Sequence, residues 1–131
     1  MERTAINPWD WSLKVGYNQA EIVTGATRQI TVSGQTSVNA AGEVQHPGDM
    51  RAQLALALDN LAAVLDAAGA GPRDVTRLGI YTTDMEQAMA NFDLLGARFG
   101  AQGATPPTTL LGVAALAMPG LMIEIEATAA T

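Results

Sequence analysis

The chain ends in PPTTLLGVAALAMPGLMIEIEATAAT, residues 106–131. This stretch predicts two apolar strands joined by a turn at Pro119-Gly120, which together would form an antiparallel hairpin. The second strand carries Glu124 and Glu126 among apolar residues, and no Lys or Arg occurs after residue 98. Because carboxylates are rarely buried without a partner or a function, this strand is the first candidate for chemistry.

The preceding segments show strand and helix patterns in turn. Apolar residues that recur every three or four positions predict a helix over residues 49–69, and Asp49 can cap its first turn. Residues 1–13 contain no clear period and are expected to be irregular. The other predicted elements are strands at residues 17–24, 28–34 and 75–83 and a second helix at roughly residues 85–100.

This order of elements, β-β-α-β-α-β-β, predicts an α+β fold with a mixed sheet and two helices on one face. A chain of 131 residues fits a single domain, residues 1–131. The opposite face of the sheet would be bare in a monomer. We therefore expect another subunit to cover that face.

Composition narrows the possible functions. A net charge of −6 argues against nucleic acid and against an anionic membrane as partners. The absence of cysteine excludes thiolate chemistry, and the single histidine excludes a metal site built from several histidines. The N-terminus has no apolar signal core and no membrane span is expected, so the cytoplasm is the simplest location.

A series of short motifs extends over nearly the whole chain. The motifs are Gly16-Tyr17-Asn18-Gln19, Thr31-Val32-Ser33-Gly34-Gln35, Gly42-Glu43, the stretch from Gln53 to Ala67-Ala68-Gly69, Tyr81-Thr82-Thr83-Asp84, Gly112-Val113-Ala114 and Ile123-Glu124-Ile125-Glu126-Ala127. Each is weak alone. Their order and spacing together resemble the Rid family, the YjgF-like reactive-intermediate deaminases.

The resemblance implies a chorismate-mutase-like fold and a homotrimer whose sheets line a central barrel, with clefts between subunits. It implies hydrolysis of enamines or imines derived from amino acids to 2-oxo acids and ammonia, without a metal or organic cofactor. It also implies three site residues. A glutamate on the last strand positions water, a tyrosine near the N-terminus lines the cleft, and an arginine starting the penultimate strand holds the substrate carboxylate.

The glutamate maps to Glu124 and the tyrosine to Tyr17, but the arginine position holds threonine. Anchoring on Gly112-Val113-Ala114 selects Thr108, whereas counting back from Glu124 without a gap selects Thr109. A hydroxyl cannot replace a bidentate guanidinium. We therefore expect poor binding of ordinary 2-imino acids and a less acidic imine, enamine or related small molecule as substrate.

Several residues have two interpretations. Gly34 either lets the backbone approach a ligand or only makes a turn. Arg28, Arg77 or an arginine of a neighbouring subunit could replace the missing one. Trp9 and Trp11 form either a hydrophobic clasp or an aromatic wall for a ligand.

The carboxylate and threonine positions also have structural interpretations. Glu124 and Glu126 could be the solvent side of a half-exposed strand, and we interpret Glu126 as mainly structural. Thr108 and Thr109 could simply be good strand formers, and Tyr17 a surface tyrosine. The leading hypothesis is a homotrimeric hydrolase. The alternatives are a trimer that binds a metabolite without turnover and a scaffold or chaperone-like trimer.

Overall fold

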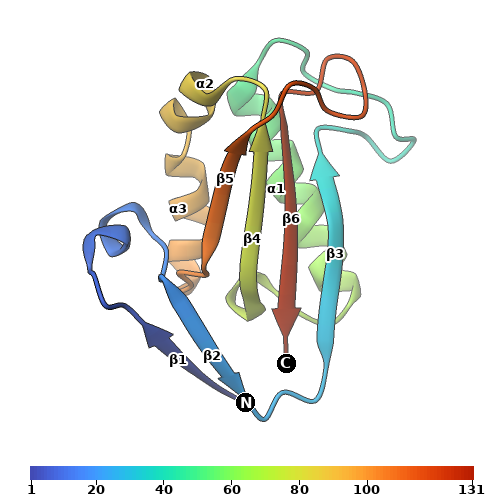
Figure 1. The fold of residues 1–131 in the computed structure, drawn as a ribbon. Helices are drawn as coiled ribbons and strands as arrows, with labels where there is room; N and C mark the ends of the chain where they lie inside the picture. The colour runs from blue at the N-terminus through green and yellow to red at the C-terminus, as the bar shows by residue number, and fades with distance from the viewer.

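The computed structural model describes all 131 residues (Figure 1). Its strands are β1 (Glu2–Ile6), β2 (Ala20–Thr24), β3 (Gln29–Thr36), β4 (Val75–Thr82), β5 (Thr108–Gly112) and β6 (Ile123–Ala130). Its α-helices are α1 (Met50–Ala67), α2 (Met85–Ala90) and α3 (Asp93–Phe99), and its 3-10 turns are η1 (Trp11–Val15), η2 (Pro72–Asp74) and η3 (Gly100–Gln102). Strands β3, β6, β4 and β5, in that spatial order, form one mixed sheet, while β1 and β2 form a separate hairpin.

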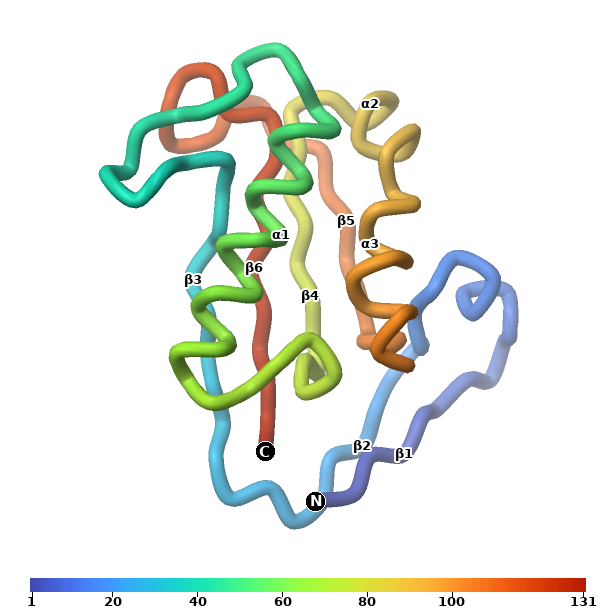
Figure 2. Tube along the Cα trace, turned by 180° about the vertical axis from the view of Figure 1, so that it is seen from behind, coloured from blue at the N-terminus to red at the C-terminus, as the bar shows by residue number.

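All three helices cover the same face of the four-stranded sheet (Figure 2). This arrangement confirms the predicted α+β architecture. The opposite face, seen from the front in Figure 1, is not covered by any element of the chain. None of the helices combines the length and apolar character needed to cross a membrane.

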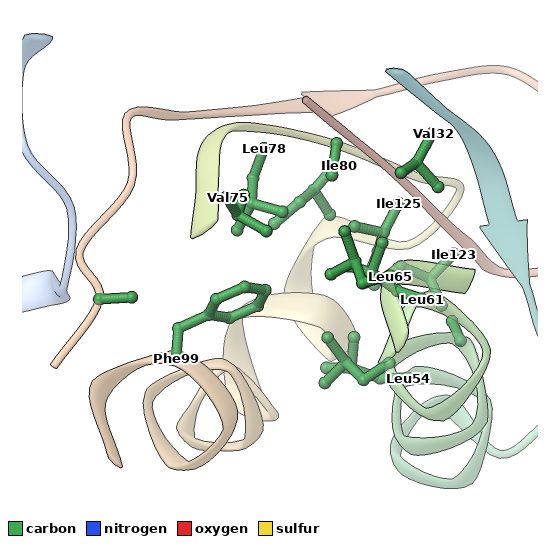
Figure 3. Close-up of a cluster of buried hydrophobic side chains, with 14 of the residues drawn as sticks. Val32, Leu54, Leu61, Leu65, Val75, Leu78, Ile80, Phe99, Ile123 and Ile125 are labelled. Atoms are coloured by element: carbon green, nitrogen blue, oxygen red, sulfur yellow. The ribbon is translucent and has the colours of Figure 1, made fainter. Parts of the chain in front are cut away.

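Helix α1 confirms the clearest sequence prediction. The Asp49 carboxylate accepts a hydrogen bond from the Ala52 amide at 3.0 Å, which caps the first turn. Its leucine stripe is buried in a core cluster of 17 residues, and each buried leucine contributes about 1.5–3 kcal/mol to stability. Figure 3 shows the centre of this core, which includes Leu54, Leu61, Leu65, Ile80, Phe99, Ile123 and Ile125.

The prediction of an irregular N-terminus was wrong, because residues 2–6 form β1 and pair with β2 in antiparallel register. Four of the five residues of β1 are exposed, so the strand lacks the apolar alternation that sequence patterns detect. The Arg3 side chain contributes to holding the hairpin in place. It donates to Glu21 at 2.9 Å and to the Val75 carbonyl at 2.7 Å, which connects β1 to the start of β4.

The predicted terminal hairpin was also wrong. Strand β6 lies between β3 and β4 and is antiparallel to both, whereas β5 lies beyond β4 and is parallel to it. The connection over residues 113–122 is long enough to cross the end of β4, so the turn at Pro119-Gly120 does not join paired strands. Ile123 and Ile125, which face the helices, gain burial from this central position.

The predicted second helix, residues 85–100, is broken into α2 and α3. The Asn91 side chain donates to the Gln87 carbonyl at 2.8 Å, which satisfies a carbonyl at the end of α2. The two short helices together still cover the β4–β5 side of the sheet (Figure 2).

Candidate functional site

The two glutamates of β6 lie on the sheet face that no helix covers. Glu124 pairs with Tyr81 of β4, and Glu126 pairs with Gly79. Residues directly opposite each other in a sheet share a face, so Tyr81 lies on the same side as both carboxylates. Both glutamates are half-buried within the single chain. No third His, Asp or Glu joins them to form a group that could hold a metal ion.

Each glutamate side chain lies over a glycine of the neighbouring strand. A Cβ atom added to Gly34 would be 2.6 Å from Cδ of Glu124, and one added to Gly79 would be 2.8 Å from Oε1 of Glu126. Gly34 sits in an irregularity of β3, where the register with β6 shifts between Val32 and Gln35. The structure therefore brings together the predicted residues Gly34 and Glu124, and only glycine leaves the carboxylate its space.

Tyr81 was not among the predicted site residues. Its hydroxyl donates to Oε1 of Glu126 at 2.6 Å. This hydrogen bond, followed by burial and the nearby carboxylates, raises the pKa of Tyr81 above its ordinary value. Glu126 therefore has an internal partner, whereas the Glu124 carboxylate takes part in no hydrogen bond or ion pair of the chain.

Arg77 is also on the uncovered face. With Thr31, Gly79, Glu126 and Thr128 it borders a hollow of about 130 Å³. The other intramolecular alternative for the missing arginine, Arg28, donates instead to the Ala68 carbonyl at the end of α1. Of these two residues, Arg77 is the one located beside the carboxylates.

Tyr17 and Thr108 meet in a different place. Both line a pocket of about 440 Å³ between η1, the α2–α3 segment and β5. Trp11 lines it too, with its ring edge-to-face with Tyr17 at a centroid distance of 6.1 Å and an interplanar angle of 86°. Trp11 therefore borders a pocket, whereas Trp9 is exposed and does not. A role of Trp11 as an aromatic wall for a ligand stays a prediction.

The two candidate threonines lie on opposite faces of β5. Thr108 is in register with Leu78 and lines the Tyr17 pocket on the helix side. Thr109 is in register with Gly79 and therefore lies on the carboxylate face. One chain thus carries two separate candidate half-sites. We call them the carboxylate face (Glu124, Glu126, Tyr81, Gly34 and Gly79) and the tyrosine pocket (Tyr17, Thr108 and the other residues lining that 440 Å³ cavity).

Comparisons with known proteins extend over the whole fold. The family model for endoribonuclease L-PSP matches residues 12–131. The crystal structure of YyfB, a Rid-family protein of unknown function from Yersinia pestis, is 38% identical with a TM-score of 0.89 and full coverage of both chains. The YjgF gene product of E. coli is 34% identical over 87% of each chain, with a TM-score of 0.68. The mitochondrial protein mmf2 of Schizosaccharomyces pombe is 31% identical over 99% of each sequence.

Proposed function

Because the chain belongs to the Rid family, whose matching model is that of endoribonuclease L-PSP, we propose that it is a cofactor-independent hydrolase of a reactive enamine, imine or related small molecule. The observation that carries this proposal is the Glu124 carboxylate. It lies over Gly34 with no partner in its own chain, on a sheet face that nothing in the chain covers. Such a group is free to hold a water molecule.

The active site is proposed to form between copies of the chain. The carboxylate face and the tyrosine pocket are different surfaces, so a contact that joins them between copies is head-to-tail. Head-to-tail contacts close into rings when the rotation permits. The family resemblance favours a ring of three, in which the sheets line a central barrel. Glu124 and Gly34 of one copy would then face Tyr17 and Thr108 of the next.

The proposed reaction is hydrolysis of a C=N bond. Glu124 accepts a proton from water as the water oxygen bonds to the imine carbon, and it then returns this proton to the nitrogen, which has received the electron pair of the C=N double bond. Collapse of the resulting carbinolamine breaks the C–N bond, which yields a carbonyl compound and ammonia. Tyr81 keeps Glu126 engaged through their 2.6 Å hydrogen bond, so Glu124 is the carboxylate left to act on water.

Ordinary 2-imino acids are not the proposed substrates, because both positions to which the family's arginine could map, Thr108 and Thr109, hold threonine. RNA is disfavoured despite the name of the family model. The chain has a net charge of −6, and the two glutamates of β6 outnumber Arg77 beside them on the uncovered face, so a phosphate backbone would meet repulsion there. The missing arginine also favours a second candidate function, a trimer that binds a metabolite without turnover.

The test is turnover of a panel of imines and enamines with and without a carboxylate, measured by ammonia release and by mass spectrometry of the carbonyl product. Glu124→Ala should reduce turnover by about 100-fold or more, since general acid–base groups contribute that much. Glu86→Ala, which removes an exposed glutamate of α2, is the matched control. Equal turnover in wild type and Glu124→Ala would remove Glu124 from the reaction, and stabilisation by a panel member without product would support the binding function.

A further inference from the structure

We infer that the substrate carries an uncharged aromatic ring, or an apolar group of similar bulk, and that this group enters the tyrosine pocket. The inference rests on the proposed function only in taking the ligand of this pocket to be the substrate. It concerns what the pocket selects, whichever reaction follows.

The lining of the tyrosine pocket has no charge. It is formed by 15 residues, of which nine are hydrophobic and none is Asp, Glu, Lys, Arg or His. A carboxylate placed in such surroundings loses its hydration and gains no ionic partner, which makes its burial costly. The pocket therefore discriminates against anionic ligands and favours neutral ones.

The size of the pocket suits a ring. Its volume is about 440 Å³, whereas a dry cavity of about 150 Å³ already accommodates benzene. The remaining space can hold the neutral group that connects the ring to the reacting atoms. A ligand with only one or two carbon atoms would leave most of the apolar lining without contacts and would bind weakly.

The side chains around the pocket are suited to aromatic contact. Trp11 and Tyr17 form one wall, and Met89 and Phe92 of the α2–α3 segment contribute to the lining. Aromatic rings pack favourably edge-to-face at centroid distances of about 4.5–7 Å, and methionine sulfur also contacts rings favourably. Trp11 and Met89 are 56% exposed each, so a bound ring would cover apolar surface that the chain leaves open to solvent.

The two hydroxyls in the pocket fit a neutral polar group. The Thr108 hydroxyl donates to the Pro106 carbonyl at 2.8 Å, so it is left to act as an acceptor toward a ligand. The Tyr17 hydroxyl has no hydrogen-bond partner within the chain and can donate. One donor and one acceptor match an amide or an imine N–H, whereas a carboxylate would find a single donor and no cation among the residues that line the pocket.

The inference is tested with benzamide, benzoate and propanamide as probes, by isothermal titration calorimetry and thermal shift on the full chain in its native assembly. Benzamide should bind at least about tenfold more tightly than both benzoate, which is charged, and propanamide, which has no ring. Thr108→Arg supplies the missing cation and should reverse the preference for benzamide over benzoate. Benzoate should bind this variant at least about tenfold more tightly than it binds the wild type. Ala63→Arg, which adds the same charge on the exposed side of α1, should leave the wild-type preference intact.

Tyr17→Phe keeps the ring and provides a second variant if Thr108→Arg does not fold. It should weaken benzamide about two- to tenfold through loss of one hydrogen bond. Benzoate binding to the wild type as tightly as benzamide, or benzamide affinity unchanged in both pocket variants, would overturn the inference. Selective benzamide binding alongside Glu124-independent turnover would refute the proposed function alone. Glu124-dependent turnover that benzamide does not inhibit would refute the inference alone.

Discussion

Replacing Gly34 with alanine should displace the proposed catalytic carboxylate of Glu124 while leaving the glutamate itself unchanged. The new methyl group would be 2.6 Å from Cδ of Glu124, whereas ordinary van der Waals contacts lie at 3.4–4 Å. The carboxylate must therefore retreat by roughly 1 Å. In the proposed reaction a misplacement of this size can reduce turnover by about 100-fold, because the water that Glu124 is proposed to hold would no longer be aligned with the C=N bond.

The stability of the chain should change little. The atoms in the way belong to the Glu124 side chain, which can turn aside, and Gly→Ala replacements also gain about 0.4–1 kcal/mol by restricting the unfolded chain. We expect the free energy of unfolding of Gly34→Ala to stay within about 1 kcal/mol of wild type. Activity and stability are thus predicted to separate, which a general loss of folding would not produce.

The assay pairs initial rates of ammonia release with denaturant unfolding of the same preparations. Gly79→Ala is the matched control, because its methyl group would be 2.8 Å from Oε1 of Glu126 and would displace that carboxylate instead. The rate of Gly79→Ala should fall by less than about tenfold, because this change disturbs only Glu126 and its hydrogen bond to Tyr81. Full activity in Gly34→Ala would refute the assignment of Glu124, as would equal losses in the two variants.

Two further predictions concern hydrogen bonds made by side chains. Gln53→Ala should lower the free energy of unfolding by roughly 2–4 kcal/mol in urea titrations. The reason is that the fully buried Gln53 side chain donates to the Gly120 carbonyl at 2.7 Å and accepts from the Met122 amide at 2.8 Å. As the control, Gln87→Ala changes an exposed glutamine and should alter the free energy of unfolding by no more than about 0.5 kcal/mol. Because the pKa of Tyr81 is raised mainly by its hydrogen bond to Glu126, this pair contributes stability that is complete below about pH 10 and is lost as the pH rises through the folded pKa. Ultraviolet titration of tyrosinate in a Tyr17→Phe background should show this pKa falling toward about 10 in Glu126→Gln, and an unchanged midpoint would contradict the contact.

The elements that the sequence predicted correctly are those whose pattern is local. Helix α1 combines a leucine stripe with a capping aspartate, so both its interior and its start are readable. Strand β1 was missed because it pairs on one edge and buries almost nothing. The terminal hairpin was predicted wrongly because a turn at Pro119-Gly120 does not reveal that β6 inserts between β3 and β4, which depends on pairing with residues far away in the chain.

The candidate site was predictable by residue but not by geometry. The motifs selected Gly34 and Glu124, which are 90 positions apart (124 − 34), yet their contact depends on a shift in the β3–β6 register. The face on which Thr108 and Thr109 each lie depends on the parallel pairing of β5 with β4, which puts Thr108 on the helix side and Thr109 on the carboxylate face. Tyr81 was missed because its partnership with Glu126 arises only across the sheet.

The most direct test asks whether the carboxylate face and the tyrosine pocket of different copies act together. Glu124→Ala and Thr108→Arg each disable one half-site, so each alone should turn over an uncharged aromatic imine at a small fraction of the wild-type rate. Refolding the two variants together in equal amounts gives mixed rings in which about one quarter of the sites combine both native halves. A site shared between copies predicts recovery to about one quarter of the wild-type rate. A mixed preparation no more active than the two variants measured separately would show that the halves do not meet across the interface.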